Sequence, residues 1–175
     1  MAHDKVEPVA PESGPEEILQ AIERQRDAVA ALPAQQDGVP YLGFYLGPEV
    51  YGLPLHQLRE VARVARLRRI PGAPAEVAGL VNLRGEIMCA LDVRAILGLT
   101  PWTPSDSAIL VALRGFADPV GLVVDAIADI YAIDPAQIDP PPATWPAERA
   151  ACFVGTARVP AGLMGLLDLN QIVKI

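Results

Sequence analysis

The sequence is short of the residues on which most enzyme and metal sites depend. It contains two histidines, His3 and His56, and two cysteines, Cys89 and Cys152. The cysteines form no CxxC pair, so they predict neither a zinc site nor a disulfide framework. Neither a GxGxxG fingerprint, a phosphate-binding loop nor a GxSxG nucleophile motif is present. We therefore expect no catalytic centre, no metal and no cofactor.

Long apolar runs and an excess of positive charge are also missing. Hydrophobic residues make up 51% of the chain, yet no stretch approaches the run of about 18 apolar residues that a membrane span needs. The net charge of −7 argues against nucleic acid as a partner. The N-terminal residues 1–8 lack the basic start and apolar run of an export signal. We expect a cytoplasmic protein that does not insert into a membrane.

What the chain does have is a pattern that occurs twice. Two segments of the first half are echoed in the second half, Tyr51–Val61 by Val120–Ile130 and Met88–Val93 by Met164–Leu169. In both copies a glycine opens the second segment, Gly79 in one and Gly155 in the other. The offset between the two copies is longer than one solenoid unit, and only two copies are present. The pattern therefore predicts one domain of two related halves rather than a solenoid. Such a domain has two similar docking faces, which favours an adaptor over an enzyme.

From Pro40 onward, short apolar segments alternate with glycine and proline turns. Strands are predicted at Tyr41–Leu46, Val50–Pro54, Val61–Ile70, Ala78–Arg84, Glu86–Asp92, Ala108–Leu113, Pro119–Val124, Ile127–Ile133, Cys152–Ala157 and Leu163–Asp168. Short helical turns are expected at His56–Glu60, after Pro74, at Val93–Leu97 and at Leu169–Val173. Together they predict an all-β fold of two small barrels that share a core.

The first 39 residues read as an extension of this domain. Residues 1–14 are rich in Pro, Glu and Ala and are expected to be disordered. Ser13 and Glu16 fit a capping box, and a helix with one apolar stripe is expected over about residues 15–32. That helix either rests on the domain or binds a partner. The main domain is expected over residues 40–175.

Aspartates repeat at equivalent places, and two roles are open to them. Asp92 and Asp168 each follow a strand and precede a helical turn, where an aspartate usually caps the backbone N–H groups of the turn. The alternative is a catalytic or ligand-binding site that uses these residues with Asp125, but no base, nucleophile or metal cluster accompanies them. Cys89 lies in an apolar strand and is expected to be an inert, buried thiol.

One segment carries a family resemblance. Residues 66–87, R-L-R-R-I-P-G-A-P-A-E-V-A-G-L-V-N-L-R-G-E-I, resemble the pattern of the CheW family of bacterial chemosensory coupling proteins. The resemblance continues through Leu91–Arg94, Gly121–Asp125, Asp134–Ile138 and Leu166–Leu169, and covers about residues 40–175. It implies two pseudo-symmetric five-stranded, SH3-like β-barrels around a shared core, which agrees with the duplicated pattern.

The resemblance also implies a role and a site. The role is non-catalytic: an adaptor that couples the cytoplasmic tip of methyl-accepting chemoreceptors to the regulatory domain of a CheA-type histidine kinase. The expected receptor-binding residues are Arg84, Asn82, Glu60, Val61 and Val81, although each valine taken alone suits the core better than the surface. The alternative is a regulator of a pilus or developmental system that acts through its N-terminal helix. The basic run of residues 63–69 either faces an acidic partner or is solvated.

Overall fold

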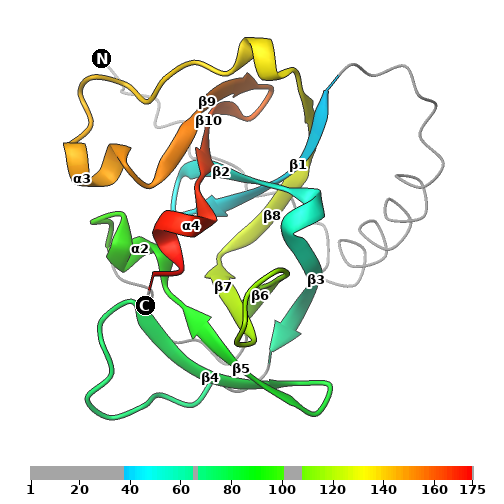
Figure 1. Ribbon diagram of the computed structural model, residues 1–175, viewed down its shortest axis with the longest axis vertical. Coiled ribbons are helices and arrows are strands. Elements are labelled where there is room, and N and C mark those ends of the chain that lie inside the picture. Colours follow the sequence, from blue (N-terminus) through cyan, green and yellow to red (C-terminus); the bar gives the residue numbers. More distant parts are fainter. Residues whose placement is uncertain (1–37, 65–66, 101–107, 175) are drawn as a thin grey trace, which may run out of the picture. The chain divides into compact units, whose positions relative to one another are not determined.

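The computed structural model describes residues 38–64, 67–100 and 108–174, which form two five-stranded sheets (Figure 1). The helix expected at residues 15–32 lies outside the described residues. The first sheet, which we call lobe A, has the strand order β8-β1-β2-β10-β9, and the second, lobe B, has the order β3-β6-β7-β5-β4. Neighbouring strands are antiparallel except for two parallel pairs, β2 with β10 and β5 with β7. The all-β class expected from the sequence is confirmed.

Lobe A contains five strands, β1 (Val39–Leu46), β2 (Glu49–Pro54), β8 (Ala126–Ile133), β9 (Phe153–Val159) and β10 (Gly162–Leu167). Lobe B contains β3 (Leu58–Val64), β4 (Val77–Leu83), β5 (Glu86–Leu91), β6 (Ala108–Leu113) and β7 (Val120–Val124). Short helical elements join them, the 3-10 turns η1 (Leu55–Gln57) and η2 (Pro135–Gln137) and the helices α2 (Val93–Ile96), α3 (Ala147–Ala150) and α4 (Leu169–Ile172).

The two sequence repeats exchange strands. The first repeat runs from β1 to β5 and the second from β6 to β10, but β1 and β2 pair with strands of the second repeat, and β6 and β7 pair with strands of the first. The chain therefore crosses between lobes twice in this region, at η1 from lobe A to lobe B and at Asp125 back to lobe A. Neither lobe is made from one repeat alone.

A backbone bridge links the two edges of each sheet, which turns the sheet into a barrel. In lobe B, Arg68 and Leu80 exchange two N–H to C=O hydrogen bonds of 2.8 Å. In lobe A, Asp139 and Thr156 do the same at 2.9 and 2.7 Å. Each bridge follows the strand at one edge, β3 or β8, and joins the strand at the other edge, β4 or β9.

The glycines that open the repeated segments lie against these bridges. A Cβ on Gly79 would be 2.3 Å from the carbonyl oxygen of Arg68, and a Cβ on Gly155 would be 2.6 Å from that of Asp139. Real Cβ atoms do not approach an oxygen so closely, so a side chain at either position would push the bridging segment away. The repeated glycine of the sequence thus marks the place where each barrel closes.

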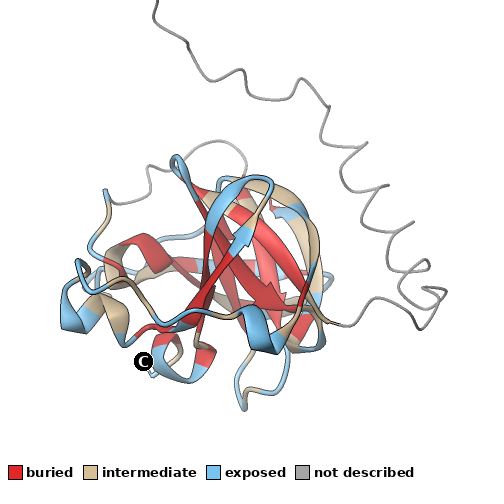
Figure 2. Ribbon diagram, turned by 90° about the horizontal axis from the view of Figure 1, so that it is seen from above, coloured by how far each residue is buried: buried red, intermediate tan, exposed pale blue. Residues whose placement is uncertain are grey.

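The buried residues, which are red in Figure 2, form three clusters. One fills the interior of lobe B, around Met88 and Leu110, and one fills lobe A, around Tyr41 and Met164. The largest lies between the lobes and draws on β1, β2, β3, β5, β6, β7, β9, β10, α2 and α4. The expected shared core is therefore the main hydrophobic cluster, and burial of its apolar surface joins the lobes into one unit.

Several local expectations are wrong. The helical turn expected at His56–Glu60 ends at Gln57, because β3 already begins at Leu58. The strand expected to reach Ile70 is described only to Val64, beyond which Arg68 forms the isolated bridge. After Pro74 there is a hydrogen-bonded turn, Val77 N to Pro74 O at 3.0 Å, and no helix. Helix α3 and the turn η2 were not foreseen.

The two repeated aspartates cap helices, as expected. The carboxylate of Asp92 accepts a hydrogen bond from the backbone N–H of Arg94 at 3.1 Å, at the start of α2. That of Asp168 accepts one from the N–H of Asn170 at 3.0 Å, at the start of α4. Each cap satisfies an N–H group that the first helical turn leaves without a partner.

Candidate interaction site

The hairpin between β4 and β5 presents Arg84 at its tip. Arg84 and Gly85 form a two-residue turn with φ values of 53° and 91°, the left-handed geometry that matches the twist of a β-hairpin. Arg84 is the only residue other than glycine with a positive φ among the described residues. The side chain of Asn82 stabilises the turn, because its Oδ1 accepts a hydrogen bond from the N–H of Gly85 at 2.8 Å.

Glu60 and Arg84 form an ion pair between opposite edges of lobe B. The Nε of Arg84 lies 3.0 Å from Oε2 of Glu60, which is on β3. The Arg84 side chain is 77% exposed, whereas that of Glu60 is 16% exposed. The carboxylate is therefore held against the barrel while most of the guanidinium faces solvent. Two residues that the sequence placed in one site are in direct contact.

Two further charged residues extend this pair into a surface network. Arg59 donates a hydrogen bond from Nη1 to Oε2 of Glu86 and lies 4.0 Å from Glu60. Glu86 directly follows the Arg84 turn, so the network joins β3 to both ends of the hairpin tip. Sequence reasoning missed Arg59 and Glu86. Their pairing depends on the closure of the barrel, which no local pattern reports.

The expected valines do not lie at the surface of the site. Val81 is 3% exposed and packs inside lobe B, and Val61 is half-buried against the cluster between the lobes. The apolar side chains that face solvent nearby are Leu80 and Ile87, which are 36% and 58% exposed. An open groove of about 620 Å³ is lined in part by Leu80, Asn82, Ile87, Arg63 and Arg68.

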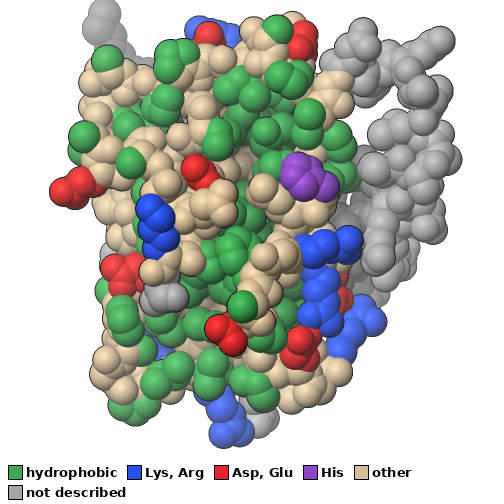
Figure 3. Space-filling view, in the orientation of Figure 1, with side chains coloured by type: hydrophobic (Ala, Val, Ile, Leu, Met, Phe, Trp, Pro, Cys, Tyr) green, Lys and Arg blue, Asp and Glu red, His purple; other side chains and the backbone are tan. Residues whose placement is uncertain are grey.

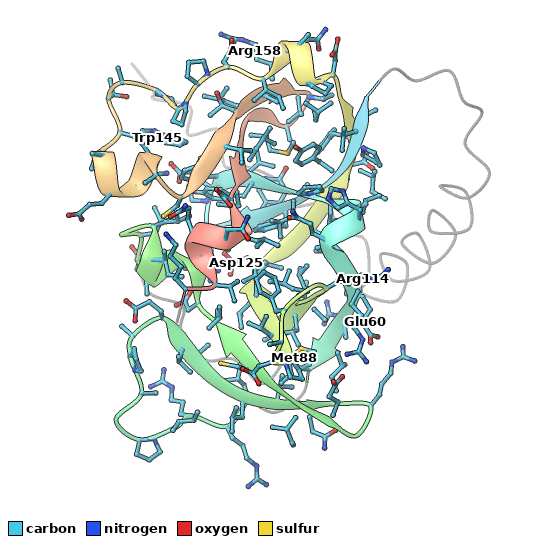
Figure 4. The ribbon with its side chains drawn as sticks, in the orientation of Figure 1. Glu60, Met88, Arg114, Asp125, Trp145 and Arg158 are labelled. Carbon is cyan, nitrogen blue, oxygen red and sulfur yellow. The ribbon has the colours of Figure 1, made fainter. Side chains whose placement is uncertain are left out.

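Arginines gather on the surface of lobe B although the protein as a whole is acidic. The exposed arginines of this lobe are Arg59, Arg63, Arg68, Arg69, Arg84 and Arg114. Figure 3 shows blue side chains along the right side of lobe B, in the region where Figure 4 labels Arg114 and Glu60. Positive potential on an acidic protein attracts an acidic partner to one face. Arg66, which the sequence grouped with these residues, lies outside the described residues.

A second charged cluster, with Arg94 and Asp92 buried and Asp125 exposed, lies at the junction of the lobes. Arg94 on α2 is 5% exposed, and its Nη1 lies 3.3 Å from Oδ1 of Asp92 while its Nη2 pairs with Asp125. Asp125, labelled near the middle of Figure 4, also accepts a hydrogen bond from the N–H of Gly47. Asp168 instead caps α4. The structure therefore engages two of the three repeated aspartates in ion pairs with one arginine, which satisfies their charge within the fold.

A third cluster attaches the segment before β9 to lobe A. Arg149 donates from Nη2 to Glu49 at 2.8 Å and to the hydroxyl of Tyr51 at 3.1 Å. Its guanidinium lies 4.6 Å from the ring centre of Trp145, which packs on Phe153. Burial, followed by the hydrogen bond to Glu49, raises the pKa of Tyr51 well above its usual range. These contacts hold the loop against lobe A, and the Nε of Arg149 is left buried without a hydrogen-bond partner among the described residues.

The thiols and the acidic residues give no sign of chemistry. Burial raises the pKa values of Cys89 and Cys152, which keeps both thiols protonated and unreactive at neutral pH. Within the described ranges, no group of three or more His, Cys, Asp or Glu side chains is placed to hold a metal ion. No helix in the same ranges is long and apolar enough to cross a membrane. The arrangement is suited to binding, with charged and apolar groups exposed beside a rigid hairpin.

Comparison with protein families finds one match over most of the chain. A model of the CheW-like domain matches residues 40–175. The chemotaxis protein CheW of Klebsiella aerogenes is 25% identical over 146 residues, which are 83% of this chain and 88% of that protein. Protein PilI of Pseudomonas aeruginosa is 32% identical over 111 residues, or 60% of this chain and 61% of that protein.

A solved structure shares the fold. The scaffolding protein TtCheW from Thermoanaerobacter tengcongensis superposes with a TM-score of 0.69 at 25% sequence identity. The match covers 79% of this chain and 89% of that one. The fold described above is thus shared with a chain described as a scaffolding protein.

Proposed function

Since the chain belongs to the CheW family, whose domain model matches residues 40–175, we propose that it is an adaptor that couples chemoreceptors to a CheA-type histidine kinase. Scaffolding in chemotaxis is the function that this family membership supports. Its action as an adaptor takes place in the cytoplasm, where the receptor tips and the kinase lie. The catalytic step belongs to the kinase.

The observation that carries the proposal is the Glu60–Arg84 pair. Four of the five N–H donors of the Arg84 guanidinium remain for a partner, because only Nε contacts Glu60 and the side chain is 77% exposed. Asn82 holds the turn that presents Arg84, and Val61 and Val81 support the strands beneath it. A receptor tip is a helical hairpin, whose carboxylates and end carbonyls suit such a fork of donors.

In this proposal, the outer surfaces of the two barrels contact the kinase. A regulatory domain of the same two-lobed fold offers surfaces that resemble those of this chain. Contacts between unlike lobes of such domains are heterologous, and repeated contacts of this kind close into rings. The receptor and the kinase then occupy different faces of one chain, so the adaptor holds both without a chemical step.

A binding assay with purified partners tests the proposal. We expect wild-type protein to bind both the kinase regulatory domain and a receptor hairpin fragment. Arg84→Glu places two carboxylates together at the turn, so it should abolish receptor binding and leave kinase binding unchanged. Arg158→Glu, the same change on an exposed residue of β9, is the matched control. Wild-type protein that binds neither partner would overturn the proposed function.

A second output is favoured by the similarity to PilI. In this alternative the adaptor serves a pilus system, and the extension of residues 1–39 contributes a partner-binding helix. Deletion of residues 1–37, which leaves all of β1 in place, separates the two possibilities. Loss of partner binding, with the fold of residues 40–175 retained, supports the pilus-type role for the helix. Full binding and signalling by the shortened protein contradicts it.

A further inference from the structure

The two crossings between the lobes differ in how they are held. The first crossing is η1, between β2 and β3, and the second is Asp125, between β7 and β8. They occupy equivalent places in the two sequence repeats, where His56 is echoed by Asp125. A symmetric protein would secure both in the same way.

The second crossing is secured by a carboxylate that contacts both lobes. One oxygen of Asp125 pairs with Nη2 of Arg94, on α2 of lobe B. Its other oxygen accepts a hydrogen bond from the N–H of Gly47, in the β1–β2 turn of lobe A. The backbone N–H of Asp125 also donates to the carbonyl of Tyr45 at 3.0 Å. We call Arg94, Asp92, Asp125 and the Gly47 amide the Arg94 clamp.

The clamp has a buried side and an exposed side. The side chains of Arg94 and Asp92 are both 6% exposed, so their charges interact with little screening by solvent, whereas that of Asp125 is 40% exposed. A guanidinium is a planar fork, and two carboxylates on it fix its orientation. The position of Asp125 relative to α2 is therefore set by charge-assisted hydrogen bonds as well as by packing.

The first crossing has no equivalent clamp. His56 stands in the place of Asp125, and Asn170, the second residue of α4, stands in the place of Arg94. Both are exposed, and among the residues that the structure describes neither side chain forms a hydrogen bond or an ion pair. The crossing keeps one backbone contact to lobe B, from Arg114 N to Gln57 O at 2.8 Å.

We infer that Arg94 and Asp125 are positioning residues, which fix the angle between the lobes so that receptor and kinase are engaged at the same time. This inference rests on the proposed function. An adaptor that binds two partners gains from holding both only when its faces are presented at the right mutual angle. One clamped crossing sets that angle, and the unclamped crossing leads directly into β3, which carries Glu60.

Hydrogen exchange tests the clamp without any partner. In Asp125→Ala, Arg94 keeps its pair with Asp92, so the fold is retained while the Gly47 amide loses its acceptor. We expect exchange at Gly47 to rise about tenfold or more, in line with loss of a local opening barrier. Asp129→Ala, four residues along on an exposed position of β8, is the matched control and should leave Gly47 unchanged. Equal exchange in both variants overturns the clamp.

The positioning role is tested by comparing the binding of each partner alone with the formation of the ternary complex. We expect Asp125→Ala to bind the receptor fragment and the kinase domain singly within about twofold of wild type, whereas the ternary complex weakens about tenfold. Arg94→Lys, which keeps the charge, should restore much of the ternary complex relative to Arg94→Met. An unchanged ternary complex overturns the positioning role. If wild-type protein binds neither partner, the proposed function fails, while hydrogen exchange still decides whether the clamp exists.

If Asp125→Ala does not fold, Asp125→Asn takes its place in both experiments. Asparagine keeps an acceptor for the Gly47 amide and removes the charge that pairs with Arg94. The ternary complex should then weaken while exchange at Gly47 stays close to wild type. A ternary complex as tight as that of wild type contradicts the inference here too.

Discussion

Arg84 combines a left-handed backbone conformation with an exposed ion pair. Its left-handed φ of 53° costs a residue with a side chain about 1 kcal/mol relative to glycine. Its exposed ion pair with Glu60 stabilises the fold by at most a similar amount, because surface ion pairs contribute about 0–1 kcal/mol. The stability of the fold therefore gives little reason for an arginine at this turn.

This balance predicts the result of Arg84→Gly. Glycine accepts the left-handed turn at no cost, so loss of the ion pair and relief of the backbone should leave the free energy of unfolding within about 1 kcal/mol of wild type. Receptor binding should fall at least about tenfold, because the donors are gone. Urea denaturation and calorimetric titration measure the two effects. A variant that is much less stable would show that Arg84 holds the fold.

Tyr51 makes stability sensitive to alkaline pH. Burial raises its pKa above the usual 10.0, so the folded state disfavours the phenolate. The resulting stability is fully present below pH 10 and is lost as the pH rises through the higher pKa of the folded state. We expect the free energy of unfolding to fall above about pH 10. In Tyr51→Phe the decline should be shallower, and an identical pH profile in both proteins would contradict this origin.

Single residues also show where sequence reasoning ends. Arg84, Asn82 and Glu60 were predicted as one site through the family resemblance. The contact between Glu60 and Arg84 was not predicted, because these residues lie on opposite edges of a sheet that closes only in three dimensions. Arg94 was not predicted as part of any site, because nothing in its local sequence distinguishes it. A lone arginine after a strand predicts a solvated side chain, and only the fold reveals the two carboxylates around it.

At the scale of the elements, the closing bridges are the most vulnerable points. Gly79→Ala places a methyl group against the carbonyl of Arg68, at a φ of +148° that also disfavours side chains. We expect a loss of about 2–4 kcal/mol in the free energy of unfolding, from steric strain and a displaced bridge. Gly98→Ala, with nothing within 4 Å of its Cβ, is the control for backbone effects alone. It should cost about 1 kcal/mol, and equal losses in both variants would contradict the role of the bridge.

The strands were largely predictable from their alternation and turns, and helices α2 and α4 from the aspartates that precede them. β6 was predicted with its observed bounds, Ala108–Leu113, because it is apolar and flanked by polar segments. The error at His56–Glu60 has a physical cause: Glu60 is polar, yet it lies in β3 because Arg84 and Arg59 satisfy its charge there. Tertiary contacts outweighed local preference at that position.

At the scale of the whole molecule, strand exchange predicts cooperative unfolding. Each lobe contains strands of both repeats, and the largest cluster of buried residues lies between the lobes. We expect one two-state transition in urea. Fluorescence of Trp145, in a Trp102→Phe background, reports on lobe A and should change together with the circular dichroism of all strands. Separate transitions would show that the lobes fold independently.

The duplication, and with it the number of lobes, could be predicted from the sequence. The exchange of strands between the repeats could not, because each repeat has the same pattern whether its strands pair within the repeat or with the other one. Which strands become partners depends on the parallel pairs β2–β10 and β5–β7, which bring distant segments together. Long-range pairing of this kind leaves no trace in local periodicity.

The strand exchange has a consequence for how such a protein can change over generations. A dimer of one repeat would build the same two barrels, but each substitution would alter both of them at once. Here the repeats lie on one chain, so each is free to vary alone. One hairpin carries Asn82-Leu83-Arg84-Gly85 and the other Arg158-Val159-Pro160-Ala161. Two repeats on one chain thus allow the hairpin of one repeat to change its sequence while the hairpin of the other keeps its own.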